Sequence, residues 1–251
     1  MNSIAASAAS ALLPMRADPV VDAAPSASAS GERAQLVRRT LSAVVMAPFA
    51  LLFIHLGAPW LDLLVAALAV QMGLEWSRMM RGLDAGAYVG WSAFGVVYVV
   101  APCLAVLWLR DVAVAGREIM LWLAVTVWTT DMAAFAVGKA IGGPRLAPAI
   151  SPAKTWAGFV GGLAGAMLVS MVMASLLQLP LAGAGLVLGA AVGLAAQGGD
   201  LLESGLKRRF GVKDTGHLIP GHGGVLDRLD AMLTAAPFVA LLVWLNGGRL
   251  P

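Results

Sequence analysis

The chain has 251 residues, of which 59% are hydrophobic and 12% are charged. Soluble globular chains carry about 25% charged residues, and a protein of this size cannot bury so much apolar surface in one core. Composition therefore excludes a soluble protein and, for most of the chain, a disordered one. The excess of 17 Lys and Arg over 14 Asp and Glu is too small to indicate nucleic-acid binding. The single cysteine, Cys103, excludes an intrachain disulfide and a cysteine metal site.

Residues 1–35 are rich in Ala and Ser and are predicted to form a flexible tail. No basic residue precedes their weak apolar stretch, which argues against a secretory signal peptide. Residues 36–251 are expected to form one membrane domain, because long apolar runs alternate there with short polar breaks.

The apolar runs predict an all-α, polytopic membrane bundle with about seven transmembrane helices. The predicted helices cover residues 41–57, 61–77, 88–108, 119–138, 156–177, 181–199 and 231–248. Two of them carry small residues at four-residue spacing, which predicts close helix packing. These residues are Gly161 and Gly165, and Gly185, Gly189 and Gly193.

The distribution of basic residues predicts the orientation of the bundle. With a cytoplasmic N-terminus and seven spans, only Arg110, Arg117 and Arg249 of the 17 basic residues fall on the opposite side. This bias predicts a cytoplasmic N-terminus and places the loops 139–155 and 200–230 in the cytoplasm.

Polar side chains at offsets of three, four and seven residues follow the sixth apolar run and share one helix face. They are Asp200, Glu203, Ser204 and Lys207. Asp200 comes directly after the apolar run, so it is expected at the membrane boundary. A carboxylate there is costly unless it meets a cation, which makes Asp200 a functional candidate.

A second charged group lies just before the last predicted helix, at Asp227, Arg228 and Asp230. Two acidic helix ends that converge from opposite sides of a basic loop can hold a divalent cation through oxygen ligands. Mg²⁺ suits such a site, because it takes one or two carboxylates and completes its shell with water and phosphate oxygens. The sequence therefore predicts a Mg²⁺ site between these two acidic groups.

Cations and glycines between the two acidic groups indicate phosphate binding. They are Lys207, Arg208, Arg209 and Lys213, followed by Pro220-Gly221-His222-Gly223-Gly224. Ser151, Lys154 and Thr155 add two hydroxyls and a lysine just before the fifth predicted helix, where a helix N-terminus also favours phosphate. A metal, cations and open backbone together indicate phosphoryl-type transfer.

Simpler interpretations stay open for several of these residues. Arg208 and Arg209 can act as topology determinants or contact anionic lipid headgroups. Asp230 can form a salt bridge or cap the last helix. Glu75, near Arg78 at the end of the second predicted helix, is interpreted as one half of a local helix pair.

Residues 200–230 resemble the signature of the phosphatidate cytidylyltransferase family, the CDP-diacylglycerol synthases. That signature reads Ser-x-x-Lys-Arg, Lys-Asp, Pro-Gly-His-Gly-Gly and Asp-Arg-x-Asp. It corresponds here to Ser204–Arg208, Lys213-Asp214, Pro220–Gly224 and Asp227–Asp230. Looser likeness extends to 131–135, similar to the family's Asp-x-x-Ala-Tyr-Phe region, and to 151–156.

The resemblance implies a nucleotidyltransferase of phospholipid biosynthesis, which makes CDP-diacylglycerol and pyrophosphate from CTP and phosphatidate with Mg²⁺. A phosphate oxygen of the lipid then attacks the α-phosphorus of CTP. The resemblance implies Asp200 and Asp227 as metal ligands, with Lys207 and Asp131 completing the catalytic group. The implied substrate-binding residues are Ser151, Lys154, Thr155, Ser204, Arg208, Lys213, Asp214, His222, Gly223, Gly224, Arg228 and Asp230. Whether a monovalent cation accompanies Mg²⁺ is left open.

The expected partners are CTP, phosphatidate and the lipid bilayer, without nucleic acid. We expect a bacterial inner-membrane protein whose active site faces the cytoplasm, and a homodimer is one alternative for its oligomeric state.

Ala153 and Ala157 stand where the family usually has a lysine and a glutamate. They keep alternatives open: a divergent paralogue with weakened activity or another lipid-phosphate acceptor, or a structural or regulatory membrane protein. A transporter is disfavoured, because the ionisable residues cluster at one membrane face.

Overall fold

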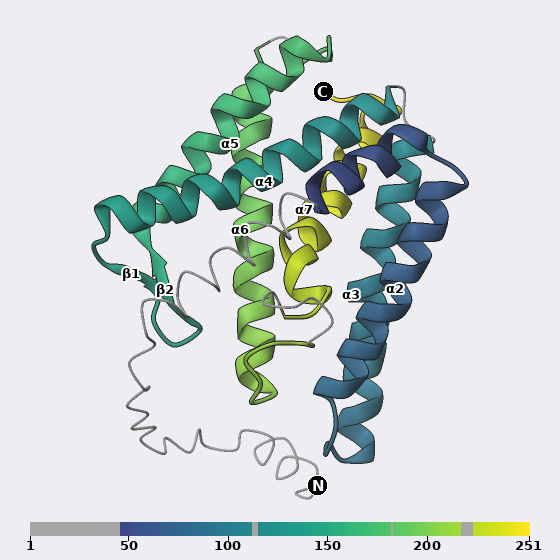
Figure 1. The fold of residues 1–251 in the computed structure, drawn as a ribbon, viewed down its shortest axis with the longest axis vertical. Helices are drawn as coiled ribbons and strands as arrows, with labels where there is room; N and C mark the ends of the chain where they lie inside the picture. The colour runs from purple at the N-terminus through teal and green to yellow at the C-terminus, as the bar shows by residue number, and fades with distance from the viewer. Residues whose placement is uncertain (1–45, 112–114, 182, 217–222) are drawn as a thin grey trace, which may run out of the picture. The chain divides into compact units, whose positions relative to one another are not determined.

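The computed structural model describes residues 46–111, 115–181, 183–216 and 223–251, and these carry seven helices and one β-hairpin (Figure 1). The helices are Met46–Leu56, α2 Trp60–Met79, α3 Ala85–Asp111, α4 Gly116–Ile141, α5 Trp156–Leu176, α6 Gly185–Arg209 and α7 Leu226–Leu245. Each predicted helix overlaps one of them, so the existence of all seven is confirmed. The predicted tail 1–35 lies outside the described residues.

Five of the described helices, α3 to α7, are long and apolar enough to cross a membrane. Large apolar side chains are exposed along them, as expected for surfaces that face lipid rather than water. The predicted helical membrane bundle is confirmed in this form. The count of seven spans and the cytoplasmic N-terminus stay predictions.

The β-hairpin departs from the predicted all-α chain. Strands β1 Arg145–Ala147 and β2 Ser151–Thr155 pair antiparallel between α4 and α5. Gly142 and Gly143 end α4 with positive φ angles of 67° and 92°, which side chains with a Cβ rarely adopt. Thr155 then caps α5, since its Oγ1 accepts a hydrogen bond of 3.1 Å from the Gly158 amide.

Glycines allow the close helix packing that the sequence predicts. A Cβ at Gly189 of α6 would lie 2.6 Å from the carbonyl oxygen of Ala166 on α5. A Cβ at Gly161 of α5 would meet Val137 of α4 at a similar distance of 2.5 Å. The backbones approach this closely only because no Cβ is present, so the small-residue prediction is confirmed.

Two clusters of buried apolar residues hold the bundle together. The first is built mainly by α4, α6 and α7 around Trp122, Val192 and Val239. The second joins the end of α2 to α3, α6 and α7, and its buried members are Met72, Trp76, Met79, Met80, Tyr98, Val99, Leu206, Val225, Leu226 and Leu233. The second cluster brings the C-terminal ends of α2 and α6 to the N-terminal end of α7, where the charged residues gather.

Candidate active site

Charged side chains line a cavity of about 250 Å³ where α4, α6 and α7 meet. Among the described residues its lining comprises Asp131, Asp200, Lys207, Asp214, Asp227, Arg228 and Asp230. All seven are residues that the sequence predicts for the site. The structure brings these seven residues to one cavity, and their roles stay predictions.

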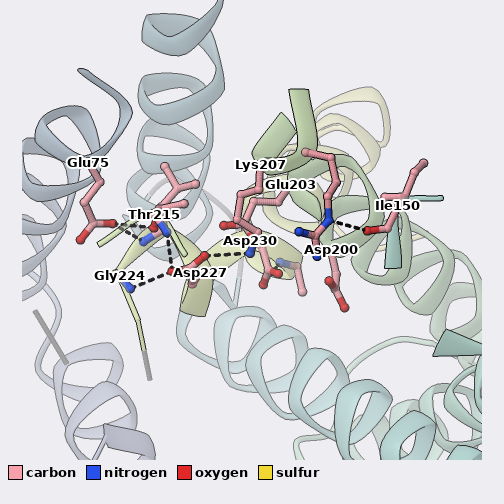
Figure 2. A network of polar contacts seen from close by, with 12 residues as sticks. Glu75, Ile150, Asp200, Glu203, Lys207, Thr215, Gly224, Asp227 and Asp230 are labelled. Atoms are coloured by element: carbon pink, nitrogen blue, oxygen red, sulfur yellow. Dashed lines mark hydrogen bonds and ion pairs between the residues drawn. The ribbon is translucent and has the colours of Figure 1, made fainter. Parts of the chain in front are cut away.

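Lys207 connects the acids of α6 with those of α7. Its Nζ lies 2.8 Å from Asp227 Oδ1 and 3.3 Å from Oε2 of Glu203 (Figure 2). Glu203 is one turn before Lys207 on α6 and is fully buried. Glu203 and Asp227 are buried carboxylates, and the partly buried Lys207 pairs with both, so this contact fixes the two helix ends to each other.

Asp227 is held by backbone as well as by Lys207. Its Oδ2 accepts hydrogen bonds of 2.9 Å from the Thr215 amide and 2.8 Å from the Gly224 amide. Gly223 has a φ of +79°, and a Cβ there would lie 2.6 Å from the same oxygen. The backbone at Thr215, Gly223 and Gly224 is therefore shaped around the Asp227 carboxylate.

The cavity has an excess of negative charge that fits a divalent cation. Among the described residues, five carboxylates line it against two basic side chains, Lys207 and Arg228. No three Asp, Glu, His or Cys side chains within the described ranges gather closely enough to bind a metal by themselves. Mg²⁺ fits this donor set, because it takes one or two carboxylates and fills its remaining positions with water and phosphate oxygens.

A second cavity of about 400 Å³ lies between α4, the β-hairpin and α5. It is lined by Asp131, Ala134, Phe135, Gly138, Lys139, Arg145, Leu146, Ala153, Lys154, Thr155, Gly158, Phe159, Gln197 and Asp200. Asp131 and Asp200 line both cavities. Lys154 forms an ion pair with Asp200 and so joins β2 to α6 at this shared wall.

Several residues predicted for substrate binding line neither cavity among the described residues. These are Ser151, Ser204, Arg208, Lys213, Gly223 and Gly224. Arg208 instead donates from Nε to the Ile150 carbonyl oxygen at 3.3 Å, which ties α6 to the turn of the hairpin. Thr155 lines the second cavity, but its hydroxyl is engaged as the cap of α5. His222 lies outside the described residues.

The sequence prediction missed two basic residues of the second cavity. Lys139 ends α4 and Arg145 begins β1, and both line the cavity beside Lys154. Their signal was present, because both fall in the predicted cytoplasmic loop 139–155. However, the hairpin was not predicted, and nothing else in the sequence indicates that Lys139 and Arg145 line the same cavity as Lys154.

The interpretation of Glu75 as a partner of Arg78 is wrong. Glu75 is fully buried, whereas Arg78 is exposed, and no ion pair joins them in the described structure. The Glu75 carboxylate instead contacts the segment that carries Asp227. Its signal was its position: Glu75 lies on the same helix face as Met72 and Met79, which are buried too.

Comparison with known proteins agrees with this geometry. The family described as the cytidylyltransferase family matches residues 82–246, which include all seven lining residues of the charged cavity. A phosphatidate cytidylyltransferase of Brucella suis is 40% identical over 178 residues, which are 71% of this chain and 63% of that protein. This chain therefore spans less than two thirds of the Brucella protein.

Two further relatives carry the same name. The phosphatidate cytidylyltransferase of Bacillus subtilis is 34% identical over 71% of this chain and 67% of its own length. That of Rickettsia bellii is 31% identical over 86% of this chain and 93% of its own length. With a family match over most of the helical bundle and relatives at this level of identity, the chain belongs to the cytidylyltransferase family.

Proposed function

We propose that the chain is a CTP:phosphatidate cytidylyltransferase that makes CDP-diacylglycerol and pyrophosphate. The observation that carries the proposal is the charged cavity, in which five carboxylates and two basic side chains from α4, α6, α7 and the segment before α7 converge. Relatives named phosphatidate cytidylyltransferase support the choice of substrates.

The reaction needs positioning and charge neutralisation more than proton transfer. A phosphate oxygen of phosphatidate, already ionised at neutral pH, forms the new bond to the α-phosphorus of CTP. The bond between the α-phosphorus and the bridging oxygen breaks, and pyrophosphate leaves with that electron pair. Lys207 and Arg228 lie in the cavity to bind and neutralise the phosphates.

Mg²⁺ fits the excess of carboxylates and would neutralise phosphate oxygens when bound. Asp200 and Asp227 would hold it, together with water and substrate oxygens. Asp227 is kept in place for this by Lys207 and two backbone amides, so its orientation does not depend on substrate. A monovalent cation beside Mg²⁺ remains an alternative within this proposal.

The second cavity suits the phosphate of a lipid. Its lining combines the basic residues Lys139, Arg145 and Lys154 with the apolar side chains Phe135 and Phe159. The described residues that line the first cavity are all charged. A phosphate monoester on a diacylglycerol presents the same combination of charge and apolar chain. Asp131 and Asp200 in the shared wall would bring the two substrates together.

Arg145 weakens the alternative of a paralogue disabled by Ala153. Ala153 lines the second cavity, and Arg145 Nη1 donates to its carbonyl oxygen at 3.3 Å. The Arg145 guanidinium therefore lies beside the backbone of residue 153, where the family usually carries a lysine side chain. This favours an active enzyme over a structural or regulatory protein.

The proposal includes a location in a bacterial inner membrane with both cavities facing the cytoplasm. The five apolar helices and the bacterial relatives support it, together with the bias of basic residues. Accessibility of Lys213 to a membrane-impermeant amine reagent in sealed vesicles tests the orientation. Crosslinking in the same vesicles separates a homodimer from a monomer.

The deciding experiment is CDP-diacylglycerol formation by detergent-purified protein with CTP, phosphatidate and Mg²⁺. Wild type is expected to form product, Asp227→Asn to lose it, and Arg81→Ala, which is exposed and lines neither cavity, to retain it. No product from folded wild type with phosphatidate, but turnover with another lipid phosphate, would favour a paralogue with a different acceptor. No turnover with any acceptor would favour the structural or regulatory alternative.

A further inference from the structure

Glu75 lies at the centre of a set of hydrogen bonds between α2 and the start of α7. Its Oε1 accepts from Gln71 Nε2 at 2.8 Å and from the Val225 amide at 3.0 Å. Its Oε2 accepts from Thr215 Oγ1 at 3.2 Å and from the Leu226 amide at 2.9 Å. Four donors therefore satisfy one fully buried carboxylate. Figure 2 shows the Glu75 carboxylate directed toward Thr215.

The Glu75 carboxylate caps the N-terminus of α7, which has no capping side chain of its own at Val225. Val225 is the residue before α7 and offers no side-chain cap to the first amides of the helix. Glu75, which is 150 residues away in the sequence, accepts from these amides instead. The partial positive charge at a helix N-terminus favours an anion there, so α2 supplies the cap of α7.

Gly216 and Gly224 leave the space that the Glu75 carboxylate occupies. A Cβ at Gly216 would lie 2.9 Å from Glu75 Oε1, and a Cβ at Gly224 would lie 2.5 Å from Oε2. Side chains at these two positions would displace the carboxylate or the backbone. Both ends of the segment therefore approach Glu75 as closely as glycine allows.

The same segment holds Asp227. Thr215 donates from its hydroxyl to Glu75 and from its amide to Asp227 Oδ2. Gly224 donates to Asp227, and the next two amides along the chain donate to Glu75. Glu75 does not line the charged cavity. However, Asp227 accepts from the amides of Thr215 and Gly224, and Glu75 binds the hydroxyl of the same threonine and the amide that follows Gly224.

We propose that Glu75 is a positioning residue: it fixes Thr215 and the start of α7, and through them the direction in which the Asp227 carboxylate faces the cavity. The inference rests on the proposed function for its effect on turnover, because Asp227 acts in that reaction. Its structural part, the fixing of Thr215 and of residues 224–226 by α2, does not depend on the reaction.

Glu75→Gln tests the proposal with little change in volume. An amide offers one acceptor oxygen, so its NH₂ group faces either the Val225 amide or the Leu226 amide, and one of them loses its acceptor. We expect kcat to fall about 10- to 100-fold, as for residues that orient a ligating carboxylate, while KM for CTP changes less than threefold. Glu75→Asp keeps the charge and is expected to retain more of kcat than Glu75→Gln.

Met72→Ala is the matched control for a general loss of stability. Met72 is buried one turn earlier on the same face of α2 and belongs to the same apolar cluster, but it makes no polar contact with the segment. Both variants are expected to lower Tm, and only Glu75→Gln is expected to lower kcat well below its Tm. Equal losses of kcat in the two variants would reduce Glu75 to a structural residue and overturn the proposal.

Hydrogen–deuterium exchange provides a readout that does not need activity. Peptides covering Thr215 and 224–230 are expected to exchange faster in Glu75→Gln than in wild type or Met72→Ala. Unchanged exchange there overturns the proposal, even if activity falls. If wild type forms no CDP-diacylglycerol but the same peptides exchange faster in Glu75→Gln, the proposed function is rejected. The conclusion that Glu75 fixes Thr215 and the start of α7 then still stands.

Thr215→Val and Thr215→Ser keep the proposal testable if Glu75→Gln does not fold. Valine removes the hydroxyl that donates to Glu75, whereas serine keeps it, and both retain the amide that donates to Asp227. We expect Thr215→Ser to resemble wild type in kcat and Thr215→Val to lose several-fold. Wild-type kcat and exchange in Thr215→Val would contradict the proposed link.

Discussion

Lys154 on β2 lies 2.5 Å from Asp200 on α6, an ion pair that joins the β-hairpin to the helical bundle. Asp200 lines both cavities, and Lys154 lines the one between α4, the hairpin and α5. The pair therefore lies in the wall that the two cavities share. Both side chains are partly accessible, so substrate phosphate can compete with Asp200 for the lysine.

Lys154→Met is expected to lower kcat/KM about 10- to 100-fold, because the phosphate loses a charge-assisted contact and Asp200 loses its partner. Lys154→Arg keeps the charge and is expected to lose less. Combining Lys154→Met with Asp200→Asn in a thermal-unfolding cycle should show a coupling of about 0.5–3 kcal/mol. Strictly additive effects would show that the ion pair does not connect hairpin and bundle.

Asp227→Asn and Asp214→Asn are expected to differ sharply although both residues line the charged cavity. Asp227 is buried and accepts from Lys207 and two backbone amides, so an amide there leaves at least one donor unpaired, at a cost of about 1–3 kcal/mol. Asp214 is exposed. We expect a lower Tm and loss of turnover for Asp227→Asn, against a nearly unchanged Tm for Asp214→Asn. A similar fall in Tm for both would contradict the burial argument.

Arg145→Ala is expected to raise KM for phosphatidate about tenfold, equivalent to about 1.4 kcal/mol, with little change in KM for CTP. The reason is that Arg145 lines the second cavity and not the charged one. Initial rates with one substrate varied at saturating levels of the other measure the two constants. If Arg145→Ala raises KM for CTP alone, the assignment is reversed: CTP binds in the second cavity and phosphatidate in the charged one.

Gly189→Ala and Gly198→Ala are a matched pair within α6. A methyl group at Gly189 would meet Ala166 and Ser170 of α5, and such overpacking costs about 1–3 kcal/mol. A methyl group at Gly198 meets nothing within 4 Å, so the better helix propensity of alanine should stabilise the helix by up to about 1 kcal/mol. Thermal unfolding in one detergent should rank Gly198→Ala at or above wild type and Gly189→Ala below it. The reverse order would contradict the packing.

Apolar runs predicted the helices because a segment that crosses lipid must satisfy its backbone within itself. The charged cavity was predictable for a related reason. Asp200 and Asp227 stand beside apolar runs, where an ionised group persists only with a function or a partner, whereas Asp131 was implied by the family resemblance. Local sequence therefore contains the information for both.

The β-hairpin and the surroundings of Glu75 depend on contacts that local sequence does not contain. The turn of the hairpin is held by Arg208 through the Ile150 carbonyl, a contact across 58 residues. The partners of Glu75 at Thr215 and Leu226 are 140 and 151 residues away. Helical periodicity indicates that Glu75 faces inward, but not which amides it meets there.

The wide sequence separation of the Glu75 contacts has a consequence for how the protein is made. During translation α2 is synthesised long before residues 215–226 leave the ribosome, so the carboxylate has only Gln71 of its four final donors nearby. It must remain hydrated or bound elsewhere until α7 arrives, because an unpaired buried carboxylate is strongly unfavourable. Docking of the last helix therefore completes the burial of Glu75 and the orientation of Asp227 in the same event.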